Sequence, residues 1–189
     1  MKIIKLKDFR NAKKSLSDAI KSGKIFVYPT DTLYGIGCNA KIRKSVEKII
    51  KAKNRDPEKP LSIIAPSKEW IFENTIITEA NKKLVDSLFP GPYTVVLKTK
   101  LKIPYIVSKN GKIGIRVPKN EFCDFIRGQG VLFVTTSVNI SDEPPATKIG
   151  DIPNEIKKIA DYAIDAGKIS GEASRVFDLS GKDVLIVRF

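Results

Sequence analysis

The stretch YPTDTLYGIG, residues 28–37, determines how the rest of the sequence is interpreted. It begins at the end of a hydrophobic run, which predicts a buried strand that stops at Pro29 because proline cannot donate to a central ladder. Two threonines, Asp31 and the glycines at 35 and 37 follow. Loops after strands hold the ligands in open α/β sheets, so we expect a ligand-binding loop here. A simple turn closed by the Asp31 side chain is the structural alternative.

The composition favours one domain with a surface that attracts polyanions. The chain has 189 residues, of which 42% are hydrophobic, so a single domain spanning residues 1–189 is expected. Its 34 lysines and arginines exceed its 21 acidic residues by 34 − 21 = 13 charges, which would attract nucleotides or RNA. Most of these cations are lysines, so solvated helix faces or adaptation to heat also explain the charge.

Histidine is absent, and the two cysteines lie far apart. Ser-His and Cys-His nucleophile pairs are therefore excluded, and any catalysis must use other groups. Cys38 and Cys123 form no C-x-x-C pair, which argues against a zinc site and for reduced thiols in the cytosol. The charged N-terminus lacks the apolar core of a signal peptide, and no apolar run reaches membrane-spanning length. We expect a cytoplasmic protein with no membrane partner.

Hydrophobic periodicity and turn residues predict helices and strands in irregular alternation. Helices capped by Thr78 and Asn120, or stopped by Gly23, are among those expected at 6–23, 44–55, 78–92, 120–130 and 153–164. Strands are expected at 25–28, 60–66, 93–100, 112–118, 131–137 and 183–189. Neighbouring strands around 93–118 favour a mixed sheet over a strict βαβ repeat, so the predicted fold class is α/β with flanking helices.

Five short stretches place small polar or cationic groups next to the expected strand and helix ends. They are 30–35, 53–62, 116–118, 135–139 and 174–175. Taken singly, each has an ordinary structural explanation: the two glycines match no complete phosphate loop, a basic triplet can complement a helix dipole, and strand-end hydroxyls can satisfy backbone groups. Arg116, within IGIRVP, either faces solvent by alternation or reaches out of the sheet into a site.

Six motifs occur in order along the chain: YPTDTLYGIGCNA, KNRDPEKPLS, FPGPYTVVL, IGIRVP, TTSVNISDEPPAT and ASRVFD. Together they resemble the YrdC-type threonylcarbamoyl-AMP synthase family, from about residue 10 to the C-terminus. The resemblance implies the short, single-domain form and a twisted mixed sheet around a concave, positively charged cavity. It also implies that L-threonine, bicarbonate and ATP are converted into threonylcarbamoyl-adenylate and pyrophosphate. A downstream transferase would then place the threonylcarbamoyl group on tRNA, on the adenosine beside the anticodon.

The resemblance assigns site residues one by one. Four would contact L-threonine: Thr32, Asn120, Ser137 and Ser174. Six would contact ATP: Arg55, Lys59, Arg116, Asn139, Thr147 and Arg188. Lys53 and Arg55 form the K-x-R element of the family and would be the catalytic cations. The chain departs from the family pattern at Asn120, where many members have histidine, and at Arg175, where threonine is usual.

The implied reaction is a nucleotidyl transfer that needs no histidine. A carbamate formed on the threonine amine would attack the α-phosphorus of ATP, while the protein positions the reactants and offsets phosphate charge. Mg²⁺ should bridge the phosphates and needs few protein ligands. A carbamate is short-lived in water, so the site should be deep, and residues 51–60 should form a lid.

Two other functions remain open from the sequence. The +13 charge also suits a module that binds double-stranded RNA or tRNA without catalysis, with an affinity that falls steeply with salt. Weak RNA binding is compatible with the enzymatic function as well. A carbamoyl-transfer domain of the kind found in hydrogenase maturation proteins resembles the same fold, but this chain lacks zinc-finger cysteines.

Overall fold

The computed structural model describes residues 1–56, 59, 61–103, 105, 106, 108 and 110–188. Its strands are β1 Lys2–Lys5, β2 Phe26–Pro29, β3 Tyr34–Gly37, β4 Ser62–Ile64, β5 Thr75–Ile76, β6 Tyr93–Thr99, β7 Lys112–Arg116, β8 Phe133–Ser137, β9 Tyr162–Asp165, β10 Arg175–Asp178 and β11 Leu185–Arg188. Its helices are η1 Leu6–Ala12, α1 Lys13–Lys21, α2 Arg43–Ala52, α3 Lys68–Asn74, α4 Glu79–Leu88, α5 Glu121–Arg127, η2 Ile149–Asp151 and α6 Asn154–Ile159.

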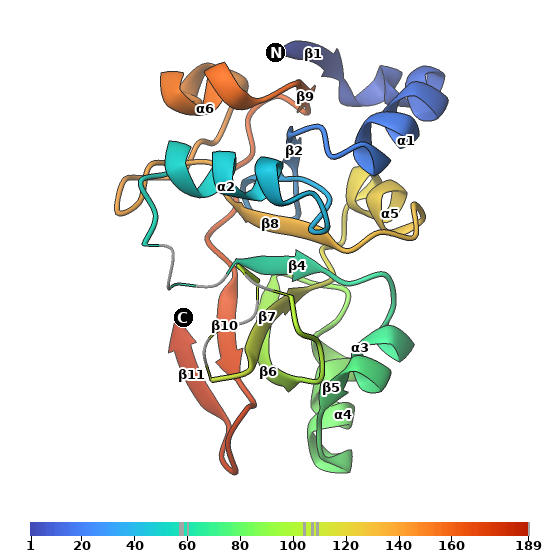
Figure 1. Cartoon of the computed structure of the whole chain (residues 1–189), viewed down its shortest axis with the longest axis vertical. Coiled ribbons are helices and arrows are strands. Elements are labelled where there is room, and N and C mark those ends of the chain that lie inside the picture. The colour runs from blue at the N-terminus through green and yellow to red at the C-terminus, as the bar shows by residue number, and fades with distance from the viewer. Residues whose placement is uncertain (57–58, 60, 104, 107, 109, 189) are drawn as a thin grey trace.

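The strands within the described residues form a twisted mixed sheet of eleven strands. Their order is β1-β9-β2-β3-β8-β4-β7-β6-β10-β11, and β5 pairs with β6. In Figure 1, β8 and β4 cross the middle of the molecule, with α1, α2, α5 and α6 above them and α3 and α4 below. Strand β4 runs parallel to β7 but antiparallel to β8, so both pairing directions occur side by side. The predicted α/β class with a mixed sheet and flanking helices is confirmed.

The stretch 28–37 is a β-hairpin rather than a loop. Strand β2 pairs antiparallel with β3, placing Tyr28 opposite Gly35, so only residues 30–33 form a turn. The prediction of a loop through residue 37 is therefore wrong. A Cβ atom at Gly37 would lie 1.9 Å from the Val134 carbonyl oxygen, so glycine at this position allows β3 to approach β8 closely.

Local capping signals predicted helix ends correctly, whereas one helix was predicted too long. The Thr78 hydroxyl accepts a hydrogen bond from the Asn81 N–H, and the Asn120 carboxamide caps α5. Gly23, just after α1, has φ +82°, as expected of a helix stop. The predicted helix 153–164 ends at Ile159, because the following residues form β9 between β1 and β2. The apolar residues at the end of the predicted helix are buried because β9 pairs within the sheet. A helical pattern in the local sequence does not reveal that pairing.

The core lies on both faces of the central strands. Val134 belongs to a cluster of aliphatic side chains, and its neighbour Phe133 belongs to a second, aromatic cluster with Phe26 and Phe122. Successive residues of a strand face opposite sides, so β8 is anchored in both clusters at once. The polar residues that follow on β8 therefore extend from a strand that packing holds on two sides.

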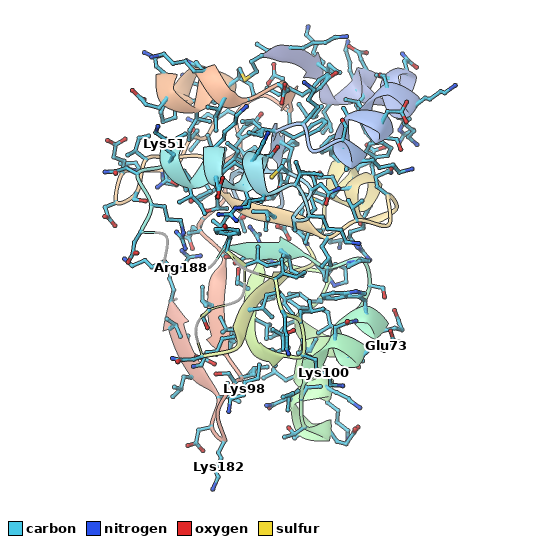
Figure 2. All side chains as sticks on the ribbon, in the orientation of Figure 1. Lys51, Glu73, Lys98, Lys100, Lys182 and Arg188 are labelled. Carbon is cyan, nitrogen blue, oxygen red and sulfur yellow. The ribbon has the colours of Figure 1, made fainter. Side chains whose placement is uncertain are left out.

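Exposed lysines lie at the periphery of the molecule. Figure 2 labels Lys51, Lys98 and Lys182, whose side chains are exposed. Both cysteines are buried, and burial raises the pKa of the Cys38 thiol to about 12. Cys38 thus packs as a small buried residue. Among the described helices, none has the length and apolar character needed to cross a membrane.

Candidate functional site

A cavity of about 450 Å³ opens where the ends of β3, β8, β7, β6 and β10 meet. Its wall combines hydroxyl groups, guanidinium groups and backbone. It is lined by Thr32, Leu33, Tyr34, Gly35, Arg55, Ser62, Thr94, Val96, Lys112, Gly114, Arg116, Thr135, Thr136, Ser137, Asn139, Glu143, Pro145, Ala173, Ser174, Val176 and Arg188. Members of all five polar stretches singled out in the sequence are present, although Thr32 and Ser174, for example, lie 174 − 32 = 142 positions apart along the chain.

The turn between β2 and β3 presents a buried hydroxyl to this cavity. The Thr30 hydroxyl accepts hydrogen bonds from the N–H groups of Thr32 and Leu33, at 3.1 and 3.2 Å, and donates to the Leu33 carbonyl at 2.7 Å. The turn is thus closed by Thr30 rather than by Asp31. The Thr32 hydroxyl lies 2.9 Å from the Thr30 hydroxyl and accepts from Nη2 of Arg116 at 3.0 Å. Thr32 is 3% exposed, so its position is fixed by these contacts.

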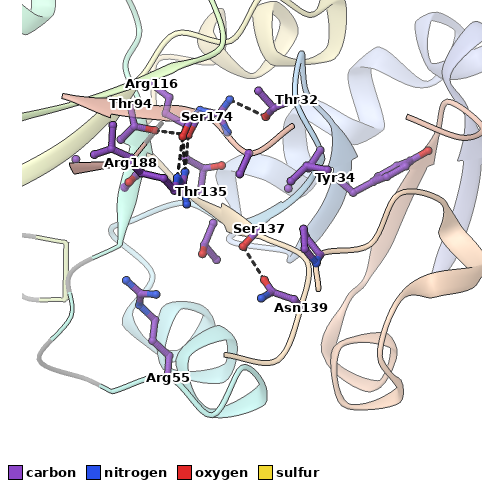
Figure 3. A pocket seen from close by; sticks show the side chains of 18 of the residues that line it. Thr32, Tyr34, Arg55, Thr94, Arg116, Thr135, Ser137, Asn139, Ser174 and Arg188 are labelled. Carbon is purple, nitrogen blue, oxygen red and sulfur yellow. Dashed lines mark hydrogen bonds between the residues drawn. The ribbon is translucent and has the colours of Figure 1, made fainter. Parts of the chain in front are cut away.

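A second cluster, of two hydroxyls and one guanidinium, is formed by Thr94 on β6, Ser174 just before β10 and Arg188 on β11. The Ser174 and Thr94 hydroxyls lie 2.8 Å apart, and Arg188 donates from Nη2 to the Ser174 hydroxyl at 2.9 Å. Arg188 also donates from Nε and Nη2 to the Ser174 carbonyl, at 2.9 and 2.6 Å. Figure 3 shows these side chains grouped together, with Arg116 and Thr32 beside them. Edge strand β11 therefore contributes to the site through its last described residue.

Lys53 lies outside the cavity wall and holds the end of β8 and the residues that follow it. Its ammonium donates to the carbonyl oxygens of Ser137 and Asn139, both at 2.7 Å, and to the Asn139 side-chain oxygen at 2.9 Å. That oxygen also accepts from the Ser137 hydroxyl at 2.6 Å. An ammonium has three N–H donors, so these three hydrogen bonds use all of them. Burial, and secondarily the charge of Arg55, lower the pKa of Lys53 to about 8.

Arg55 reaches toward the cavity from the segment after α2, apart from the group around Ser174 (Figure 3). Its Nε donates to the Lys59 carbonyl at 3.1 Å. Burial lowers the pKa of Arg55, and burial together with the charge of Arg116 lowers that of Arg188. Guanidinium groups nevertheless keep their charge at neutral pH in proteins. Three guanidiniums therefore face one cavity, in which Glu143 supplies a carboxylate.

The structure brings most of the residues assigned by the resemblance together. The cavity wall includes seven of them: Thr32, Arg55, Arg116, Ser137, Asn139, Ser174 and Arg188. Four of those described lie outside the wall: Lys53, Lys59, Asn120 and Thr147. The Asn120 side chain accepts from the Phe122 and Cys123 N–H groups, and the Thr147 hydroxyl donates to Asp151 at 3.0 Å. Within the expected lid 51–60, residues 57, 58 and 60 lie outside the described residues.

Several wall residues were not singled out from the sequence. Thr94 lies inside the motif FPGPYTVVL, but a threonine within a β-branched strand carries no signal that separates a site hydroxyl from a packing residue. Lys112 lines the cavity while its ammonium pairs with Asp178 at 3.0 Å. Tyr28, in the opening motif, is fully buried and donates to the Thr135 hydroxyl at 2.6 Å. It supports the wall from behind.

Comparison with known proteins identifies the family. A family model named Sua5_yciO_yrdC, described as telomere recombination, matches residues 18–189. The chain belongs to this family. The resemblance inferred from the six motifs is thereby confirmed, and the Sua5/YciO/YrdC match extends over the cavity residues from Thr32 to Arg188.

Individual members of the Sua5/YciO/YrdC family are similar over most of the chain. A Methanocaldococcus jannaschii protein, provisionally named threonylcarbamoyl-AMP synthase, is 36% identical over 99% of this chain and 92% of its own length. The threonylcarbamoyl-AMP synthase of Buchnera aphidicola is 31% identical over 78% of this chain and 86% of its own. The crystal structure of Pyrococcus abyssi Sua5 complexed with L-threonine superposes with a TM-score of 0.86 at 26% identity. That match covers 99% of this chain but 56% of the P. abyssi chain.

Proposed function

We propose that the protein is a threonylcarbamoyl-AMP synthase, which makes threonylcarbamoyl-adenylate and pyrophosphate from L-threonine, bicarbonate and ATP. The observation that carries this proposal is a single cavity with buried hydroxyls at one end and Arg55 at the other. Relatives named for this activity, and a Sua5 structure complexed with L-threonine, support it. A small amino acid and a triphosphate are the ligands that such a divided cavity suits.

The hydroxyl-lined end is proposed to bind L-threonine. Thr32, Thr94 and Ser174 offer hydroxyls that can either donate or accept, which suits the amine and hydroxyl groups of an amino acid. Arg116, which the resemblance assigns to ATP, lies 3.0 Å from the Thr32 hydroxyl and so belongs to this end. Its charge suits the threonine carboxylate, because charge-assisted hydrogen bonds to a carboxylate are the strong ones. Gly35 also lines this end, and a Cβ atom there would lie 3.1 Å from Tyr28 Cζ, so glycine leaves room for the buried tyrosine that supports the wall.

The other end is proposed to bind ATP. Arg55 would offset phosphate charge, and Ser137 and Asn139 on the wall would contact both reactants. Lys53 would act by holding these two residues, because its ammonium already donates three hydrogen bonds to them. Lys59 and Thr147 would contribute only from outside the cavity wall.

Mg²⁺ is proposed to enter with ATP. Among the described residues, no group of three or more acidic, histidine or cysteine side chains is placed to hold a metal ion. Mg²⁺ commonly uses one or two carboxylates together with substrate phosphates and water. Among the described residues of the wall, Glu143 is the acidic one that could supply a carboxylate. Bound Mg²⁺ would supply charge to the phosphate oxygens.

The chain's own part in the reaction is to bind, orient and exclude water. The threonine amine is first carboxylated, and a carbamate oxygen then displaces pyrophosphate from the α-phosphorus. Holding both reactants in one cavity converts a bimolecular step into an effectively unimolecular one. Fixed cations at the phosphates stabilise the charge that moves onto the leaving group. The reaction needs no histidine as a general acid or base, and the chain contains none.

The test is incubation with ATP, Mg²⁺, L-threonine and labelled bicarbonate. Adenylate that carries the label, and pyrophosphate released from ATP, should form only when all substrates are present. Arg55→Ala should lower turnover by about 100-fold or more, because it removes a fixed charge from the phosphates. Lys51→Ala is the matched control: it removes a cation from α2 at an exposed position outside the cavity, and activity should be retained. Absence of product from the wild-type protein would overturn the proposal, as would full activity of Arg55→Ala.

We further propose that the adenylate passes to a threonylcarbamoyl transferase acting on tRNA, and that the reaction takes place in the cytoplasm. An adenylate is a reactive mixed anhydride, so transfer to a nearby acceptor enzyme protects it from water. Exposed lysines would allow weak RNA contacts, which should weaken as salt is raised. Product formation that responds to RNA only at low salt would fit that secondary role.

A further inference from the structure

Asp31 is a largely buried carboxylate that contacts a residue of the proposed site from outside the cavity wall. It lies at the tip of the β2–β3 turn, and its side chain is 11% exposed. One oxygen, Oδ1, accepts from Nη2 of Arg116 at 3.1 Å, and the other, Oδ2, accepts from the Lys119 backbone N–H at 2.9 Å. Asp31 does not line the cavity. It therefore touches the site only through a residue that does.

The contacts of Arg116 show what Asp31 controls. Nη2 donates two hydrogen bonds, one to Asp31 and one to the Thr32 hydroxyl, and these use both of its hydrogens. Nε is buried and has no partner within the described part of the chain. A buried polar group without a partner in a native structure calls for an explanation such as a ligand. The Arg116 side chain is 13% exposed, so its rotamer cannot change without disturbing the wall.

We propose that Asp31 is a positioning residue for threonine binding: it fixes the Arg116 guanidinium and, through it, the Thr32 hydroxyl. This inference rests on the proposed function. The carboxylate stabilises the charge of Arg116 in a site with little water, and its second bond ties the turn to the chain just after β7. Two ligand-facing groups, one on the β2–β3 turn and one at the end of β7, thereby keep one relative geometry before substrate arrives. Preorganisation of this kind lowers the cost of ordering side chains when a ligand binds.

Asp161 offers a matched control elsewhere in the fold. Its Oδ1 accepts from the Lys24 ammonium at 3.1 Å, and its Oδ2 accepts from the Ile25 backbone N–H at 2.8 Å. The pattern of one cation and one backbone N–H is the same as at Asp31. Asp161 lies outside the cavity wall, so its loss should affect stability but not the binding of threonine.

The experiment compares Asp31→Asn, Arg116→Gln, the double variant and Asp161→Asn. L-threonine binding is measured by calorimetry, and KM and kcat are measured for threonine and ATP. Asp31→Asn should weaken threonine binding by roughly tenfold or more, raise the KM for threonine similarly, and leave the KM for ATP within about twofold. The double variant should match Arg116→Gln, because Asp31 acts through that side chain. Asp161→Asn should bind threonine like the wild type.

Each outcome decides the inference. Unchanged threonine affinity in Asp31→Asn, losses that multiply in the double variant, or an equal loss in Asp161→Asn would overturn it. If Asp31→Asn does not fold, Asp31→Ser supplies a smaller replacement for the same comparison. A wild-type protein that binds threonine but makes no adenylate would overturn the proposed function while Asp31 is still tested by calorimetry. A wild-type protein that binds no threonine would overturn both.

Discussion

Gly171→Ala should disable the site while leaving the fold intact. Gly171 lies three residues before Ser174, and a Cβ atom there would lie 2.0 Å from the Thr32 carbonyl oxygen. Ordinary contact begins at about 3.4 Å, so one backbone segment must move by about 3.4 − 2.0 = 1.4 Å. Either Thr32 or the segment carrying Ser174 would be displaced. A misplacement of about 1 Å can lower the rate about 100-fold, and overpacking costs about 1 to 3 kcal/mol.

The assay measures adenylate formation and thermal unfolding on the same preparations. For a domain of this size, that cost lowers Tm by about 2 to 12 °C. Turnover should fall by about 100-fold at a temperature where the variant is folded. Gly150→Ala is the control, because its nearest neighbour would be Lys148 Cε at 3.8 Å, and it should behave like the wild type. Full activity of Gly171→Ala would refute the claim that these segments must keep their spacing.

Two further predictions concern buried titratable groups. The pKa of Lys53 is lowered from 10.5 to about 8, so the unfolded chain binds more protons between these pH values and stability rises with pH. In denaturant unfolding, the free energy of unfolding of the wild type relative to that of Lys53→Met should rise by about 2 kcal/mol between about pH 8 and 10. A difference between the two proteins that does not change with pH would contradict this. Burial raises the pKa values of Cys38 and Cys123, so a thiol reagent should label neither until the chain unfolds; rapid labelling of the native protein would count against their burial.

The elements with local signals were predictable from the sequence. The helix that begins after Thr78 and the helix that begins after Asn120 carry their own capping residues, so neighbouring sequence suffices to place them. Strand β9 and strand β3 depend on partners far along the chain. Glycines usually weaken a strand, yet Gly37 lies in β3 because β8 passes directly against its backbone. That reason becomes visible only when both strands are placed.

The candidate site also contains residues that the sequence could predict and residues that it could not. Motif order alone grouped Thr32, Arg116 and Ser174, and the structure places all of them on one cavity wall. The sequence could not show that Lys53 points behind the wall, because a lysine beside an arginine has the same pattern whether it faces ligand or backbone. Neither could it show the role of Thr94, whose neighbours in space come from β10 and β11.

The cavity draws residues from Thr32 to Arg188, which is nearly the whole length of the chain. A cut anywhere between Thr32 and Arg188 would leave no fragment that contains the whole cavity, and no nascent chain could complete it before the last strand is synthesised. Contacts between residues so distant in sequence form late and slowly compared with local helices. Recovery of threonine binding after dilution from denaturant would therefore report completion of the entire topology, whereas helical circular dichroism would return earlier.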